Sequence, residues 1–89
     1  MKPIEFSKNF EKAYKTRISK NQKLKAKYEL CYRLFLAGER GYPLNDHSLT
    51  GLMAGKRAFS ITGDVRVIYI ETEQAIIFLD IGSHNQVYN

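Results

Sequence analysis

Residues 57–79, RAFSITGDVRVIYIETEQAIIFL, decide the fold. This stretch contains three runs in which β-branched and aromatic residues dominate, and such residues favour strands: 57–62, 65–70 and 75–79. Gly63-Asp64 lies between the first two runs and suits a two-residue hairpin turn, and residues 71–74 suit a second turn. The pattern predicts a meander of three antiparallel strands.

The sequence before this meander begins with a strand and then changes to helical spacing. Residues 2–6, KPIEF, alternate weakly and predict a short first strand. Ser7 is a suitable helix N-cap, and Phe10, Tyr14 and Ile18 recur on one face of a first helix. We therefore expect a strand followed directly by a helix with one buried stripe.

A second helix is predicted after a polar turn, with Asn21 as its N-cap. One face of this helix carries the residues expected to be buried: Leu24, Tyr28, Cys31 and Phe35. Gly38 and Gly41 end the helix, and Pro43 prevents it from resuming. Two antiparallel helices joined by a tight turn are the expected outcome.

Taken together, these elements follow the order β-α-α-β-β-β. The order predicts an α+β fold in which a helical hairpin packs on one face of a small antiparallel sheet. A chain of 89 residues predicts a single domain over residues 1–89. The residues after Ile81, GSHNQVYN, are expected to form a loop or a short tail against the sheet.

The charge of the chain is uneven. Fourteen Lys and Arg residues against nine Asp and Glu give a net charge of +5. Between residues 8 and 27 the only acid is Glu11, among eight basic residues: Lys8, Lys12, Lys15, Arg17, Lys20, Lys23, Lys25 and Lys27. Such a cluster attracts polyanions, and we expect Lys20, Lys23 and Lys27 to contact RNA. A merely solvated helix face remains an alternative, whereas the absence of Trp disfavours a membrane-surface helix.

Other features of the composition bear on location and on metal binding. The first twenty residues are basic and have no apolar core of a signal peptide, and no apolar run is long enough to span a bilayer. The only cysteine, Cys31, excludes an internal disulfide and a multi-cysteine zinc site, and it has no ligand spacing to either histidine. We expect a cytoplasmic protein that uses no metal or other cofactor and does not bind membranes.

Two histidines are candidates for acid–base chemistry. His47 and His84 both lie in polar, loop-like contexts, NDHS and GSHN. Imidazole titrates near neutral pH, as a general acid or base requires. The alternative is that both are surface histidines without a task, and the composition does not distinguish the two.

Three cations lie in or beside the predicted sheet: Lys56, Arg57 and Arg66. A guanidinium group matches two phosphate oxygens, so these cations are candidates for a phosphate clamp. The alternative is that they pair with nearby acids such as Asp64. Near the C-terminus, Tyr88 either stacks on an RNA base or pins the tail to the sheet.

Four segments taken together resemble the YafQ-like branch of the RelE toxins of type II toxin–antitoxin modules: LNDHSLTG at 44–51, GKR at 55–57, DVRVIY at 64–69 and IGSHNQVY at 81–88. The resemblance is close over residues 44–88 and covers the helical half by element order only. It implies a ribosome-dependent endoribonuclease that cleaves mRNA in the decoding site and is inhibited by a cognate antitoxin. It also implies a helical hairpin packed on a small antiparallel sheet.

The resemblance also implies roles for individual residues. The RNA 2′-OH would attack the adjacent phosphate, with His84 as the general acid and either His47 or Asp64 as the general base. Arg66, with Arg57 and Lys56, would stabilise the phosphate charge, and Tyr88 corresponds to a terminal aromatic of the family. The chain departs from the family pattern at three positions: Ser60 replaces a histidine, Val65 a tryptophan and Asp80 an arginine.

Three other functions remain compatible with the sequence. The first is a ParE-like toxin that inhibits DNA gyrase by binding and performs no cleavage, although His84 in its GSHNQVY setting disfavours it. The second is a ribosome- or RNA-binding module with an inert site, and the third is an adapter for an antitoxin-like partner. The expected states are a monomer or a toxin–antitoxin hetero-oligomer.

Overall fold

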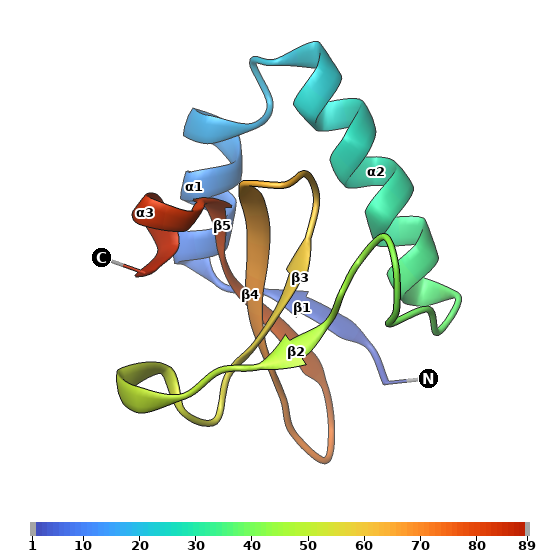
Figure 1. Ribbon diagram of the computed structural model, residues 1–89, viewed down its shortest axis with the longest axis vertical. Coiled ribbons are helices and arrows are strands. Elements are labelled where there is room, and N and C mark those ends of the chain that lie inside the picture. The colour runs from blue at the N-terminus through green and yellow to red at the C-terminus, as the bar shows by residue number, and fades with distance from the viewer. Residues whose placement is uncertain (1, 89) are drawn as a thin grey trace.

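The computed structural model describes residues 2–88, which form an α+β fold with α1 and α2 on one face of a mixed sheet (Figure 1). Along the chain the elements are β1 (Ile4–Phe6), α1 (Lys8–Arg17), α2 (Gln22–Leu36), β2 (His47–Ser48), the 3-10 turn η1 (Gly51–Met53), β3 (Arg57–Ser60), β4 (Val65–Glu71), β5 (Ile76–Ser83) and α3 (His84–Tyr88). The predicted α+β class and the order of its main elements are confirmed.

Both predicted helix caps are present. The Ser7 hydroxyl accepts a hydrogen bond from the Phe10 N–H at 3.0 Å, and the Asn21 side chain accepts one from the Leu24 N–H at 3.1 Å. These bonds satisfy amide groups that have no partner inside the first turn of a helix. α1 and α2 then run in opposite directions, as predicted, and splay apart away from the turn that joins them (Figure 1).

The predicted meander is confirmed, since β4 pairs antiparallel with both β3 and β5. Within the described residues the sheet has five strands in the order β1-β5-β4-β3-β2. It differs from the wholly antiparallel sheet that was predicted, because β1 pairs in parallel with β5. A strand of three residues carries too little pattern to specify a partner some seventy positions away, so this pairing depends on how α1 packs.

The predicted ends of the strands also need correction. β3 ends at Ser60, two residues early, because the Thr62 hydroxyl accepts hydrogen bonds from the Asp64 and Val65 amides and extends the turn. β5 continues to Ser83 instead of ending at Leu79, with an irregularity in its register with β4. His47 and Ser48, expected in a loop, form the edge strand β2.

The C-terminal segment is a helix rather than the predicted loop or tail. Ser83 and Gln86 form a capping box, in which the Gln86 side chain accepts from the Ser83 N–H at 2.8 Å and the Ser83 hydroxyl accepts from the Gln86 N–H at 3.3 Å. The motif S-x-x-Q in SHNQ is the signal that predicts this helix. α3 thereby holds residues 84–88 against the end of the sheet.

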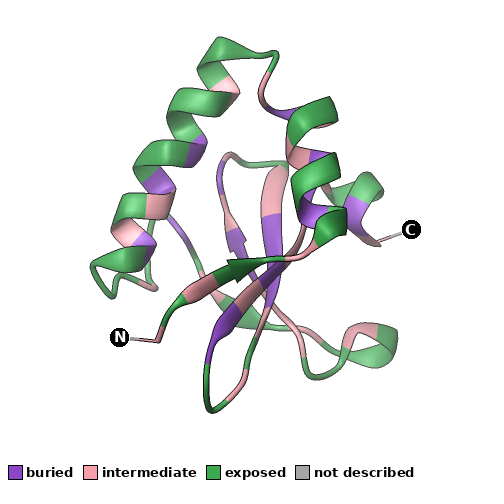
Figure 2. Cartoon of the chain, turned by 180° about the vertical axis from the view of Figure 1, so that it is seen from behind, coloured by how far each residue is buried: buried purple, intermediate pink, exposed green. Residues whose placement is uncertain are grey.

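The main core lies between the sheet and the two long helices (Figure 2). Phe35 of α2 stacks on Phe59 with ring centroids 4.8 Å apart, and Phe78 meets both rings edge-on at 5.6 Å. All three side chains are fully buried. Large aromatic side chains bury much apolar area, so this cluster contributes strongly to the stability of the fold.

The other face of the sheet has no such cover. Within residues 2–88, the apolar cluster on this face consists of the buried Ala58, Ile68 and Val87, with Leu49, Met53 and Tyr88 partly buried around them. Val87 belongs to α3, so this short helix covers one end of the face and leaves the rest open. Among the described residues, no helix is both long enough and apolar enough to cross a membrane.

Candidate active site

His47 owes its position to the residue before it. Leu44 is fully buried, and the Asp46 side chain points into the helix-covered side of the sheet with none of its surface exposed. There the Asp46 carboxylate accepts hydrogen bonds from the Arg57 Nε at 2.8 Å and from the Tyr69 hydroxyl. Side chains alternate along extended backbone, so anchoring Asp46 on one face presents His47 on the other.

The Asp46 contacts have electrostatic consequences. They raise the pKa of the Arg57 guanidinium above its ordinary value, so Arg57 is a fixed cation. Burial, followed by the hydrogen bond to Asp46, raises the pKa of the Tyr69 hydroxyl to about 12. Tyr69 therefore remains a neutral donor, and these three side chains form a satisfied polar network at the edge of the core.

The orientation of the His47 ring selects its tautomer. His47 Nδ1 lies 2.9 Å from the Asn45 carbonyl oxygen. A carbonyl oxygen can only accept, so Nδ1 carries the hydrogen and the lone pair of the neutral ring is on Nε2. His47 is opposite Ala58 in the β2–β3 ladder and thus faces the open side of the sheet. A neutral His47 offers Nε2 there as a base.

Arg66 faces the same open side. It pairs with Ser60 across β3 and β4, three residues before the inward-facing Tyr69. Its guanidinium donates to the Gly63 carbonyl at 3.2 Å and lies 6.0 Å from the centroid of the Tyr88 ring. Its Nε is buried without a hydrogen-bond partner among residues 2–88. A buried N–H without a partner is costly, and the guanidinium also keeps Nη donors from which an anion bound at Arg66 would accept.

His84 is the first residue of α3, and its ring is exposed. Its backbone N–H donates to the Asp64 carboxylate at 3.2 Å, which ties α3 to the β3–β4 turn. The His84 and Tyr88 rings meet edge to face, with centroids 4.6 Å apart. The Tyr88 ring therefore contacts His84 and lies near the Arg66 guanidinium.

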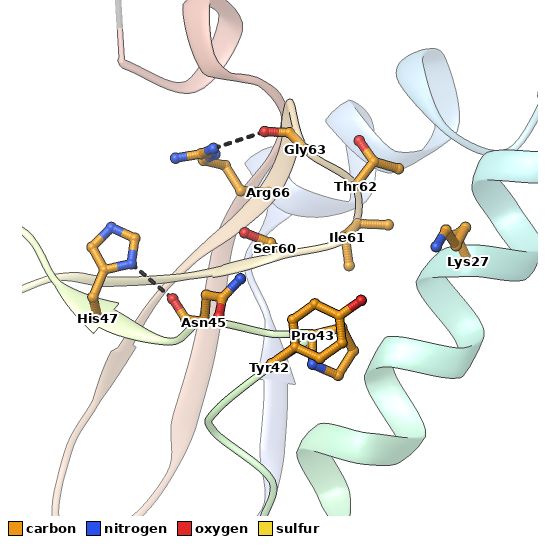
Figure 3. A pocket seen from close by; sticks show the side chains of 10 residues that line it. All are labelled: Lys27, Tyr42, Pro43, Asn45, His47, Ser60, Ile61, Thr62, Gly63 and Arg66. Atoms are coloured by element: carbon orange, nitrogen blue, oxygen red, sulfur yellow. Dashed lines mark hydrogen bonds between the residues drawn. The ribbon is translucent and has the colours of Figure 1, made fainter.

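A pocket of about 480 Å³ lies on this side of the molecule (Figure 3). Its lining residues come from α2, the segment before β2, the end of β3 and the start of β4: Lys27, Tyr42, Pro43, Asn45, His47, Ser60, Ile61, Thr62, Gly63 and Arg66. The pocket combines an imidazole, two cations and several hydrogen-bonding groups, which suits a ligand that carries phosphate.

A family model described as "Bacterial toxin of type II toxin-antitoxin system, YafQ" matches residues 2–89 of the chain. The chain belongs to the YafQ family of toxins. Among curated proteins, none matches this YafQ-family toxin significantly.

Solved structures of YafQ have the same fold as this YafQ-family toxin. The crystal structure of YafQ from E. coli strain BL21(DE3) is 24% identical with a TM-score of 0.83, and each chain covers 100% of the other. YafQ in the E. coli DinJ–YafQ complex is 25% identical with a TM-score of 0.81, again over 100% of both chains. A YoeB/ParE toxin from Agrobacterium tumefaciens, 19% identical, has a TM-score of 0.74 over 94% of this chain and 99% of its own.

The structure of this YafQ-family toxin brings most of the predicted site residues to one side. His47, Arg66 and Lys27 line the pocket. Tyr88 lies near Arg66 and contacts His84, whose backbone N–H donates to Asp64. The predicted phosphate-binding residues Lys20 and Lys23 are exposed near the start of α2 but do not line the pocket. Lys56 directly precedes β3, and its carbonyl oxygen accepts from the Leu49 N–H.

Arg57 does not lie with Arg66. Arg57 is opposite Tyr69 in the sheet, which puts it on the helix-covered side, whereas Arg66 is on the open side. Arg57 is also paired with Asp46 at 2.6 Å, so its charge is already balanced within the chain. Its assignment to phosphate stays a prediction, and the geometry favours a structural role.

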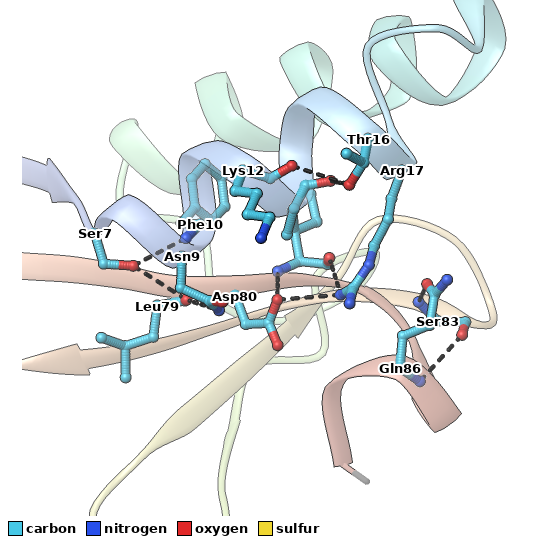
Figure 4. A network of polar contacts seen from close by, with 12 residues as sticks. Ser7, Asn9, Phe10, Lys12, Thr16, Arg17, Leu79, Asp80, Ser83 and Gln86 are labelled. Atoms are coloured by element: carbon cyan, nitrogen blue, oxygen red, sulfur yellow. Dashed lines mark hydrogen bonds and ion pairs between the residues drawn. The ribbon is translucent and has the colours of Figure 1, made fainter.

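Asp80, which replaces a family arginine, lies outside the pocket. Arg17 Nη1 donates to the Asp80 carboxylate at 3.2 Å and to the Ile81 carbonyl at 3.0 Å (Figure 4). Ser7 and Asn9 donate to the Leu79 carbonyl, at 3.1 and 2.9 Å. Side chains of α1 and its N-cap thus bond to the carbonyl groups of β5 beyond the point where β1 pairs with it. Asp80 holds the Arg17 side chain in place there.

Sequence reasoning missed two contributors to the site. In the sequence, Asp46 belongs to a polar, loop-like segment. Its position between a buried Leu and a strand indicates an inward-pointing side chain only when Arg57 and Tyr69 are known to lie beside it. Tyr42 carried no signal, because nothing in the sequence locates it beside His47 and Arg66. In the described part of the chain, no group of three or more His, Cys, Asp or Glu residues is arranged to hold a metal ion.

Proposed function

We propose that this YafQ-family toxin is an endoribonuclease that cleaves mRNA in the decoding site of the ribosome without a metal. The observation that carries the proposal is the shared pocket of His47 and Arg66. The His47 Nδ1–H is held by the Asn45 carbonyl, and its Nε2 remains available. The Arg66 Nε is buried with no partner among the described residues. A base and an unsatisfied guanidinium on one open face suit attack at a phosphate.

The proposed reaction is an internal transfer at the RNA phosphate. His47 Nε2 removes the proton from a 2′-OH, and the 2′-oxygen attacks the adjacent phosphorus. The bond from phosphorus to the 5′-oxygen breaks, His84 protonates that oxygen, and a 2′,3′-cyclic phosphate remains. Arg66 stabilises the charge on the non-bridging oxygens as it builds up. Asp64, whose carboxylate accepts from the His84 N–H, positions α3 and so the proton donor.

Two kinds of partner follow from this proposal. Seven of the eight basic residues between positions 8 and 27 are exposed lysines on or between the two long helices, and one of them, Lys27, lines the pocket, which suits ribosomal RNA and mRNA. The E. coli relative forms a DinJ–YafQ complex, and we propose that a cognate antitoxin binds this toxin as well. Such a toxin acts in the cytoplasm, where translating ribosomes are.

Toeprinting on translated mRNA tests the proposal. The wild type should cut the message within the decoding site, and His84→Gln should lose about a hundred- to ten-thousand-fold in rate, because a general acid typically contributes that much. Leu52→Ala is the matched control, because Leu52 is fully exposed at the η1 turn and lies outside the pocket. Ribosome binding by both variants should equal that of the wild type.

Two results would contradict the proposal. If the wild-type protein binds ribosomes but the mRNA stays intact, the protein is a ribosome-binding module without catalysis. Growth arrest with intact mRNA and inhibited gyrase would favour a ParE-like toxin. Wild-type cleavage by His84→Gln would reject the assigned proton donor while leaving the endoribonuclease in place.

A further inference from the structure

The pocket extends well beyond the groups that the proposed reaction uses. His47 and Arg66 account for two of its ten lining residues. The rest of the lining includes Tyr42, Pro43 and Asn45 from the segment before β2, and Lys27 from α2 (Figure 3). Its volume of about 480 Å³ falls in the range of about 300–1,000 Å³ that ligand pockets occupy. A phosphate group alone is far smaller than this space.

Tyr42 is unusual among the aromatic residues of the chain. The residue is 88% exposed, although it lines the pocket, and among the described residues its ring has no aromatic partner. The segment that carries Tyr42 is nevertheless fixed, since Leu44, two residues later, is fully buried and its carbonyl accepts from the Ser60 N–H at 2.7 Å. An anchored, exposed aromatic ring in a cationic pocket is a surface on which an RNA base can stack.

Polar groups of the pocket near Tyr42 are free to bind a ligand. Within residues 2–88, the Asn45 side-chain amide and the Ser60 hydroxyl make no hydrogen bond, while the Thr62 hydroxyl accepts two backbone amides and keeps its own hydrogen to donate. Asn45 has a backbone φ of 46°, in the left-handed region that Asn tolerates better than most residues. Such donors and acceptors match the edge of a base, whereas a second phosphate would call for further cations.

We propose that this part of the pocket is a nucleobase subsite, in which Tyr42 stacks on the RNA base next to the cleaved phosphate and Asn45 and Ser60 bond to the edge of that base. The inference rests on the proposed function for the position of the phosphate, which lies at Arg66 and His47. Tyr42 then helps to choose where the message is cut, and purines bind better than pyrimidines because they offer a larger stacking area.

The test measures binding to an RNA that cannot be cleaved. A fluorescent hexanucleotide with 2′-O-methyl groups, and a set in which each base in turn is removed, are titrated against wild type, Tyr42→Ala and Tyr42→Phe. Wild type should bind one abasic member about 5- to 100-fold more weakly than the intact RNA, as expected for one stacked base. Tyr42→Ala should bind the intact RNA weakly to the same extent and no longer distinguish that abasic member.

The controls separate stacking from other effects. Tyr42→Phe keeps the ring and should behave like wild type, and Leu52→Ala removes an equally exposed apolar side chain outside the pocket and should do so too. The subsite is overturned if wild type binds no hexanucleotide, binds all abasic members as tightly as the intact RNA, or if Tyr42→Ala still distinguishes them. Because no step of this assay is cleavage, base-dependent binding by a protein that leaves mRNA intact would reject the proposed function and keep the subsite.

Discussion

The two faces of the sheet differ in how completely their side chains are packed and hydrogen-bonded. On the helix-covered face, Phe35, Phe59 and Phe78 are fully buried against one another. The polar groups at the edge of this face are also satisfied, since the Asp46 carboxylate meets both Arg57 and Tyr69. Within residues 2–88, the side chains of this cluster and this network are therefore paired with one another.

The open face has the opposite character. Its apolar cluster consists of Ala58, Ile68 and Val87, and its polar groups are incompletely paired, as the buried Arg66 Nε shows. One face therefore stabilises the fold, while the other keeps polar groups that are free for a ligand. Substitutions on the two faces should therefore have separable effects on the free energy of unfolding and on cleavage.

The largest effect on stability is expected from Phe59→Ala. Removing a fully buried phenyl ring between Phe35 and Phe78 should lower the free energy of unfolding by about 3–5 kcal/mol, because it removes buried area and leaves a cavity. Urea denaturation followed by circular dichroism measures this. Leu52→Ala should stay within about 0.5 kcal/mol of wild type. Equal losses in the two variants would mean that the aromatic cluster does not contribute strongly.

A smaller effect on stability is expected at Asp46, whose side chain lies on the helix-covered side while the next residue, His47, faces the open side. Asp46→Asn removes the charge that holds Arg57 and leaves a weaker partner for Tyr69, so the free energy of unfolding should fall by about 1.5–3 kcal/mol. Cleavage should fall too, because Asp46 anchors the segment that presents His47. His47→Gln, by contrast, should lose cleavage and keep its stability. Full cleavage by folded Asp46→Asn would show that the anchor does not position His47.

The capping box of α3 offers a still smaller effect. Gln86→Ala removes the acceptor for the Ser83 N–H and should lower the free energy of unfolding by about 1 kcal/mol. Hydrogen exchange should increase in residues 84–88 and remain slow in β3 and β4. Gln86→Glu keeps an acceptor oxygen and serves as the control. Exchange that is unchanged in Gln86→Ala would show that α3 does not depend on this box.

The smallest effect concerns an exposed ion pair at the end of β4. The Lys2 ammonium donates to the Glu71 carboxylate at 2.9 Å and lowers the pKa of Glu71 in the folded state. A carboxyl whose pKa is lowered by folding contributes stability above its unfolded pKa of about 4.3, and that stability is lost as the pH falls. Because both side chains are well exposed, Glu71→Gln should remove only about 0.2–1 kcal/mol at pH 7. Glu73→Gln is the control, and a pH dependence of stability identical in all three proteins would exclude the contribution.

Much of the fold was predictable because local pattern and packing agree. The three runs that contain the strands of the meander are rich in β-branched and aromatic residues, and both helix caps are Ser or Asn in their usual place. The parallel pairing of β1 could not be predicted, since its partner is set by packing. β2 was missed because two residues, His47 and Ser48, have no period to read.

The candidate site was predictable only as a set of residue types. The sequence supplied His47, His84 and Arg66, but it could not show that Arg57 lies on the opposite face from Arg66, because that depends on the register of β3 with β4. Nor could it show that Tyr42 enters the pocket, which depends on where Leu44 is buried. Register and long-range packing, rather than propensity, decide both.

The central claim is that two imidazoles on the open face exchange protons with the RNA. The most direct measurement is the pH dependence of the single-turnover cleavage rate, from about pH 5 to 8. Loss of a proton from His47 should raise the rate as the pH increases, and loss of a proton from His84 should lower it, which gives a bell-shaped profile. His47→Gln should lose the rising limb, His84→Gln the falling limb, and Arg66→Ala should be slower at every pH with both limbs present. A flat wild-type profile, or both limbs present in both histidine variants, would contradict the account.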